Sequence, residues 1–151
     1  LRTERIDETG RLDEEYFEEG FPLTEDEKIR IYQKDVREIQ LAKSAIRAGL
    51  ETLIRKYQVS CEDIDQIYIA GGFGYKLDIE KAVQIGLLPE ECKEKITAVG
   101  NSSLQGAKKS LETDDAKARW ESLVRHSEEI ELASSKEFQE LYMEHMLFPE
   151  E

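Results

Sequence analysis

The most regular pattern of apolar and polar positions lies in the first half of the chain and predicts one long helix over 35–57. Apolar side chains recur there at three- and four-residue spacing, which places them on one face of a helix. The positions that share this face are Val36, Ile39, Ala42, Ala45, Ile46, Leu50, Leu53 and Ile54. Asp35, with Glu38 three residues later, has the spacing of a capping box, so we expect the helix to begin there.

Shorter patterns predict strands that alternate with helices along the rest of the chain. Apolar runs predict strands at 29–32, 66–70, 96–99 and 129–132. Further helices are predicted at 79–85, from the turn at 100–103 through 111, at 114–125 and at 135–146, with Asp78 and Ser134 as N-caps of the first and the last. Such alternation predicts an α/β fold with a mostly parallel sheet flanked by helices.

The first part of the chain lacks this regularity. Residues 1–27 are rich in charge and carry only short apolar pairs, so we interpret them as a poorly defined charged segment with a hairpin around residues 9–10. Residues 28–151 are assigned to a single subdomain. The start at Leu1 rather than Met suggests a fragment of a longer protein.

The charge balance narrows the choice of partner. Acidic residues outnumber basic residues by 34 to 21, which gives a formal net charge of −13. Nucleic acids and anionic membranes are bound by clustered Lys and Arg, so we expect neither as a partner, and a basic or neutral protein fits better. No apolar run approaches the roughly 20 residues of a membrane span, and no leader pattern opens the chain, so we expect a cytoplasmic protein.

The cysteines and histidines carry no metal-ligand pattern. Cys61 and Cys92 stand apart, without CxxC or His-rich spacing, so no metal site is predicted, and each cysteine is expected to be a small packing or surface residue. His126 and His145 have no acidic or cysteine partner at ligand spacing and are expected to be surface or boundary side chains.

Two glycine turns are the candidates for a ligand site. Gly71 and Gly72 follow an apolar strand, where a missing side chain lets a ligand approach the backbone. A second turn, at residues 100–103, also follows a strand and opens a helix whose first N–H groups favour an anion or a polar ligand group. On spacing alone, simple connecting turns explain these glycines equally well, and the pattern is neither a dinucleotide fingerprint nor a P-loop.

Several motifs in a fixed order carry a family resemblance. They are YQKDVREIQLAK at 32–43, IYIAGGFG at 67–74, IGLLP at 85–89 and VGNSSLQGA at 99–107. The string resembles the C-terminal ATPase region of the reductive activators of corrinoid proteins, over about residues 28–149. The resemblance implies a subdomain of the actin, heat-shock-chaperone and sugar-kinase superfamily, with a ribonuclease H-like α/β fold. It also implies ATP with Mg²⁺, an iron–sulfur cluster in an N-terminal domain, and reduction of cob(II)amide to cob(I)amide on a corrinoid protein.

A more distant similarity to the heat-shock-chaperone ATPase implies which residues face the nucleotide. They are Gly71, Gly72, Phe73 and Gly74 on one wall of the cleft and Gly100, Asn101 and Ser102 on the other. Gln33, Lys34 and Asp35 are further candidates for contact with the nucleotide or a partner, although helix capping is the favoured explanation.

Phosphate loops and cluster cysteines are expected upstream, so this chain would supply one wall of the ATP site and, alone, would not hydrolyse ATP. Its expected partners are the upstream domains and a corrinoid protein, with a homodimer possible. Two other functions remain open: a nucleotide-free interaction or dimerisation module, and part of a small-molecule kinase of the same superfamily.

Overall fold

The computed structural model describes residues 5–149, apart from the side chains of Phe73 and Tyr75. Its first elements are a turn of 3-10 helix, η1 (Glu14–Tyr16), and a two-stranded antiparallel sheet of β1 (Phe21–Pro22) and β2 (Arg30–Ile31). The predicted hairpin around residues 9–10 is confirmed, because Ile6 and Leu12 form an antiparallel bridge across that turn.

The N-terminal segment contributes to the core of the molecule. Leu12 is 1% exposed and packs in one cluster with Val36 and Phe148, which come from the long helix and from the end of the chain. Residues 1–4 of the predicted charged segment lie outside the described residues. The division of the chain at residue 28 stays a prediction.

The predicted long helix is confirmed as α1 (Gln33–Lys56), but it begins two residues earlier than expected. Tyr32, in an extended conformation, is the N-cap, so Asp35 occupies the third helical position. The Asp35 carboxylate accepts a hydrogen bond from the Tyr32 backbone N–H at 2.9 Å. The prediction that Asp35 caps the helix was therefore wrong, and this side chain closes the first turn from inside the helix.

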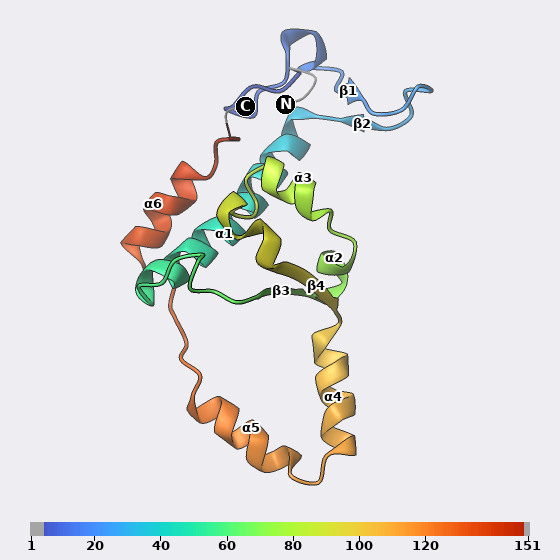
Figure 1. Ribbon diagram of the computed structural model, residues 1–151. Helices are drawn as coiled ribbons and strands as arrows, with labels where there is room; N and C mark the ends of the chain where they lie inside the picture. The colour runs from blue at the N-terminus through green and yellow to red at the C-terminus, as the bar shows by residue number, and fades with distance from the viewer. Residues whose placement is uncertain (1–4, 150–151) are drawn as a thin grey trace.

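The face of α1 that is most deeply buried is mostly polar. Its buried residues are Val36, Gln40, Lys43, Ser44, Ala48 and Thr52. Ile39, Ile46 and Leu53, from the predicted apolar face, are 40%, 45% and 40% exposed. The cause is α6 (Lys136–Glu144), which lies alongside α1 (Figure 1) and presents backbone carbonyl groups that polar side chains can bind.

A parallel pair of strands forms the centre of the second half. β3 (Ile67–Ala70) and β4 (Ile96–Gly100) pair from Ile67 opposite Ile96. After β3 the chain forms α2 (Gly71–Tyr75) and α3 (Ile79–Gln84), and the 3-10 helix η2 (Glu90–Lys95) leads into β4. Asp78 caps α3 as predicted, accepting a hydrogen bond from the Lys81 N–H at 3.2 Å. A parallel sheet flanked by helices agrees with the predicted fold class.

Two helices follow β4 and extend away from the strand pair, at a wide angle to each other (Figure 1). They are α4 (Ser102–Glu112) and α5 (Ala116–Arg125), close to their predicted positions. The strand predicted at 129–132 was wrong: this segment is irregular, and within residues 5–149 no strand lies beside it to complete a ladder. The final helix begins after Ser135, whose hydroxyl accepts from the Phe138 N–H at 3.3 Å, so Ser135 is the N-cap in place of Ser134.

No helix among the described residues combines the length and the apolar character that a bilayer span requires.

Candidate functional site

The carboxyl ends of β3 and β4 bring the two glycine turns together. Ala70 at the end of β3 lies opposite Gly100 at the end of β4, after a shift in register between Ile69 and Ala70. Gly71 begins α2 directly after β3, and Ser102 begins α4 two residues after Gly100. In α/β folds, ligands bind beyond the carboxyl ends of parallel strands, so this edge is the candidate site.

The backbone of Gly71 and Gly72 faces open space. Apart from its chain neighbours and the backbone of its own helix, a Cβ atom placed on either residue would meet no described atom within 4 Å. Gly71 has a φ of 97°, which side chains with a Cβ rarely adopt, whereas Gly72 has no such restriction. Gly72 lines a hollow of about 440 Å³ together with Lys76, Asp78 and Lys81. The missing side chains therefore leave room for a ligand against the main chain.

The other residues of this glycine motif behave differently. Gly74 is buried, and a Cβ atom there would overlap the Cγ2 methyl group of Ile69 on β3. Gly74 thus lets α2 pack closely on the strand, and its role is structural rather than ligand-facing. The side chain of Phe73, another candidate, lies outside the described part of the chain.

The second turn is shaped by a helix cap. Gly100 has a φ of 67°, and the Asn101 side chain accepts a hydrogen bond from the Leu104 N–H at 2.9 Å, which makes Asn101 the N-cap of α4. Gln105 donates to the Val99 carbonyl at 3.1 Å and holds the same turn from inside the helix. Ser102 is exposed at the start of the helix, where the first N–H groups have no intrahelical acceptor. These groups can bind a polar ligand group.

Gln33, Lys34 and Asp35 do not join the glycine turns. Gln33 accepts from the Leu12 N–H at 2.9 Å and donates to the Gly10 carbonyl at 2.7 Å. The Lys34 ammonium lies 5.6 Å from the centre of the Tyr32 ring. Figure 1 shows the beginning of α1 beside β2, well apart from α2. The structure gives these three side chains local partners that hold the N-terminal segment and the helix end.

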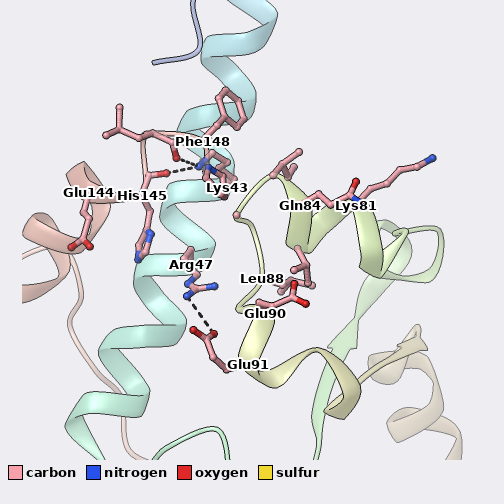
Figure 2. A pocket seen from close by; sticks show the side chains of 15 residues that line it. Lys43, Arg47, Lys81, Gln84, Leu88, Glu90, Glu91, Glu144, His145 and Phe148 are labelled. Carbon is pink, nitrogen blue, oxygen red and sulfur yellow. Dashed lines mark hydrogen bonds and ion pairs between the residues drawn. The ribbon is translucent and has the colours of Figure 1, made fainter. Parts of the chain in front are cut away.

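A larger hollow of about 890 Å³ lies between α1, the end of α3 and the C-terminal residues (Figure 2). Its wall includes Lys43, which is 1% exposed and forms no ion pair with a carboxylate among residues 5–149. The Lys43 ammonium donates to the carbonyls of His145 and Leu147, each at 2.6 Å, and lies 4.9 Å from the centre of the Phe148 ring. Burial, helped by the neighbouring Arg47 charge, lowers the pKa of Lys43 to about 8.

Lys43 is one of three polar side chains of α1 that hold the C-terminal end of the chain. Gln40 donates to the Met146 carbonyl at 2.7 Å, and Ser44 donates to the Tyr142 carbonyl at 3.0 Å. These carbonyls lie at and just beyond the end of α6, where helix carbonyls lack intrahelical donors. Sequence reasoning missed this set, although Val36, Gln40, Lys43 and Ser44 recur at helical spacing.

An acidic partner that the sequence did not indicate lies beside His145. The Glu51 carboxylate accepts from Arg47 Nε at 2.7 Å, and the same Oε1 lies 3.1 Å from His145 Nε2. Burial raises the pKa of Glu51, but the hydrogen bond from Arg47 and the close approach of His145 outweigh it, and the net pKa lies below its ordinary value. Across the hollow, Arg47 Nη2 lies 4.0 Å from Glu91 Oε2 (Figure 2). These contacts join α1 to α6 and to η2.

The two cysteines are not separate packing residues. Cys61 and Cys92 form a disulfide, with their Cα atoms 5.3 Å apart and a sequence separation of 31. The expectation of independent thiols was wrong because the parallel pairing of β3 and β4 brings the segments before both strands together. Within residues 5–149 no group of three or more His, Cys, Asp or Glu side chains is arranged to hold a metal ion.

Comparison with known proteins now places the chain. A family model described as the C-terminal domain of RACo, the ASKHA domain, matches residues 1–151. The chain belongs to this family. A corrinoid activation enzyme, RamQ, from Eubacterium limosum is 37% identical over 124 residues, which are 82% of this chain and 21% of that protein. The [Co(II) methylated amine-specific corrinoid protein] reductase of Methanosarcina barkeri is 32% identical over 120 residues, which are 76% of this chain and 22% of that protein.

A solved structure agrees with this family assignment. The structure of a reductive activator for a corrinoid, iron–sulfur protein matches 99% of this chain with a TM-score of 0.84 and 34% identity, and the match covers 26% of that protein. The resemblance inferred from the motifs is therefore confirmed, and so is the ASKHA fold class. The chain spans between a fifth and about a quarter of the length of these relatives.

Proposed function

We propose that this chain is the C-terminal ATPase region of an ATP-dependent reductive activator of a corrinoid protein. In the whole protein, one electron would pass from an iron–sulfur cluster in an N-terminal domain to the cobalt of the corrinoid, which changes cob(II)amide into cob(I)amide. The names of the relatives support this assignment. They are a corrinoid activation enzyme, a Co(II) corrinoid protein reductase and a reductive activator. The partner would then be a corrinoid protein.

The observation that carries the proposal is the open backbone of Gly71 and Gly72 beside Gly100. Two turns at the carboxyl ends of neighbouring parallel strands leave space within 4 Å of the two consecutive glycines. We propose that adenosine or the inner phosphates of ATP lie against Gly71 and Gly72. The N–H groups at the start of α4 would then bind a polar group of the same nucleotide.

The proposed ATP site forms one wall of a nucleotide cleft. The residues beyond β3 and β4 offer backbone, glycine and hydroxyl groups, and within residues 5–149 they are not accompanied by a cluster of acidic side chains that could hold Mg²⁺. Phosphoryl transfer needs a positioned metal ion and an activated water as well as a nucleotide wall. We therefore assign Mg²⁺ binding and hydrolysis to the complete protein, together with segments that lie outside this chain.

Nucleotide titration of the full-length protein with Gly72→Val tests the site. Gly72 has room for a side chain and no unusual φ, so valine should fit without unfolding the domain while filling the ligand space. We expect binding of ADP or ATP, measured by calorimetry, to fall by at least tenfold.

Gly49→Ala is the matched control, because Gly49 lies in α1 and its new Cβ would lie at an ordinary 3.6 Å from Leu132 Cδ1. Its affinity should equal that of the parent protein. Normal affinity in folded Gly72→Val would place the nucleotide elsewhere, and a full-length protein that binds no nucleotide would refute the proposed function itself.

A further inference from the structure

The disulfide lies at the opposite end of the strand pair from the glycine turns. Cys61 precedes β3, and Cys92 lies in η2, which precedes β4. Because the two strands run parallel, the Cys61–Cys92 link joins their beginnings, while Gly71 and Gly100 lie at their ends. The same two strands therefore connect the disulfide to the proposed nucleotide turns.

A second, non-covalent link joins the same two segments. The Lys95 ammonium, at the end of η2, donates to the Cys61 carbonyl at 2.6 Å and to the Glu62 carbonyl at 2.9 Å. Asp63 accepts from the Ser60 N–H at 2.8 Å and closes the turn that holds Cys61. These contacts need no sulfur–sulfur bond. The segment before β3 can therefore stay in place, more loosely held, when the disulfide is open.

The two cysteine residues differ in exposure. Cys92 is 0% exposed and lies in η2, the segment that precedes β4. Cys61 is only partly buried, in a turn at the surface. Thiol–disulfide exchange requires a thiolate to reach one sulfur atom directly. An external thiol can therefore attack at Cys61 and release Cys92.

We propose that Cys61 and Cys92 form a reversible thiol–disulfide modification site that controls how firmly the nucleotide turns are held. A thiolate of a dithiol reductant bonds to Cys61 Sγ, the bond between the two cysteine sulfurs breaks, and Cys92 leaves as a thiolate and takes a proton. The second thiol of the reductant then attacks the reductant sulfur atom that is bonded to Cys61 Sγ. Cys61 is released as a thiol, and the reductant becomes a disulfide, so two electrons and two protons enter the protein.

The effect on the nucleotide rests on the proposed function. With the disulfide closed, the beginnings of β3 and β4 are tied covalently, and the turns at their ends are ordered before the ligand arrives. With the disulfide open, part of that ordering must accompany binding, which weakens affinity. We expect ADP to bind three- to tenfold more weakly after reduction, because Lys95 maintains part of the link.

The test uses the full-length protein, oxidised with oxidised glutathione or reduced with dithiothreitol, and a Cys61→Ser/Cys92→Ser variant treated identically. Alkylation with iodoacetamide after unfolding in urea, which exposes the buried Cys92, followed by peptide mass analysis, should label neither cysteine in the oxidised protein and both in the reduced one. Calorimetry with ADP should show weaker binding for the reduced parent. The variant should bind like the reduced parent in both treatments, which also controls for effects of oxidation on any iron–sulfur cluster.

A different experimental result would contradict each part of this proposal. Alkylation of both cysteines after oxidation would show that no disulfide forms. Equal ADP affinity in the oxidised and reduced parent, with the thiols fully converted, would show that the site does not act on the nucleotide turns. Absence of ADP binding in both states would contradict the proposed function instead, while the alkylation pattern would still decide whether the thiol–disulfide site exists.

Discussion

Lys43 offers a stability test whose sign can be worked out from the structure. Its buried ammonium donates to the His145 and Leu147 carbonyls, and burial lowers its pKa from 10.5 to about 8. In Lys43→Met an unbranched chain of similar length is kept, but the ammonium and both of its hydrogen bonds are lost. Leaving buried acceptors without donors costs about 1–3 kcal/mol each, and removing a buried charge recovers part of that cost. We expect the variant to unfold about 2 kcal/mol more easily at pH 7.

The pH dependence is the more specific part of this prediction. Between pH 8 and 10.5 the unfolded chain keeps a proton on Lys43 that the folded chain has lost, so the folded state gains stability as pH rises. Each pKa unit corresponds to about 1.4 kcal/mol, and access of water through the neighbouring hollow reduces the full effect. The difference in free energy of unfolding between the parent chain and Lys43→Met should therefore increase by about 1 kcal/mol between pH 7 and pH 9.5.

Urea unfolding at both pH values, followed by circular dichroism, gives the required free energies. Lys34→Met is the control, since Lys34 is exposed near the beginning of the same helix, and its penalty should be small and should not grow with pH. A Lys43→Met penalty that stays constant or shrinks toward pH 9.5 would refute the reasoning. It would mean that the ammonium is well solvated in the folded chain.

Two further substitutions test the packing of the glycine turns. Gly74→Ala should destabilise the fold by about 1–3 kcal/mol in urea unfolding, because its Cβ would overlap Ile69 and force α2 away from β3; an unchanged midpoint would contradict the close packing. Asn101→Ala removes the cap of α4 and should cost about 1 kcal/mol, whereas Asn101→Ser should keep most of that stability; equal loss in both variants would argue against the cap.

Local patterns predicted most elements of this fold, because their causes are local. The period of α1, the capping of α3 by Asp78 and the parallel strands at 67–70 and 96–100 all follow from residues close together in sequence. The cap predicted at Ser134 was one residue early because Ser135 offers the same hydroxyl group. The cap at Asp35 was misplaced because this carboxylate bonds back to the Tyr32 N–H from inside the first turn. The prediction of a strand at 129–132 was wrong for another reason. A strand needs a neighbouring strand to accept its backbone hydrogen bonds, and the sequence pattern does not show whether one is present.

The buried face of α1 could not be read from apolar spacing. Gln40, Lys43 and Ser44 are buried because α6, about a hundred residues later, ends with its carbonyl groups against them. A polar side chain is favourable there only because an acceptor meets it, so the burial depends on a long-range contact. The disulfide of Cys61 and Cys92 has the same origin, since it depends on which strands become neighbours.

The glycine motif shows why a family resemblance and a structure answer different questions. The resemblance implied that Gly71, Gly72 and Gly74 all lie on the same wall of the nucleotide cleft, but only the first two face open space, while Gly74 fits against Ile69. The close packing of α2 on β3 that Gly74 permits fixes where the open backbone of Gly72 lies relative to Gly100. The open backbone at Gly72 and the packing at Gly74 therefore depend on each other. A substitution at Gly74 should move the proposed nucleotide wall even though it touches no nucleotide, whereas one at Gly72 should block the space and leave the wall in place.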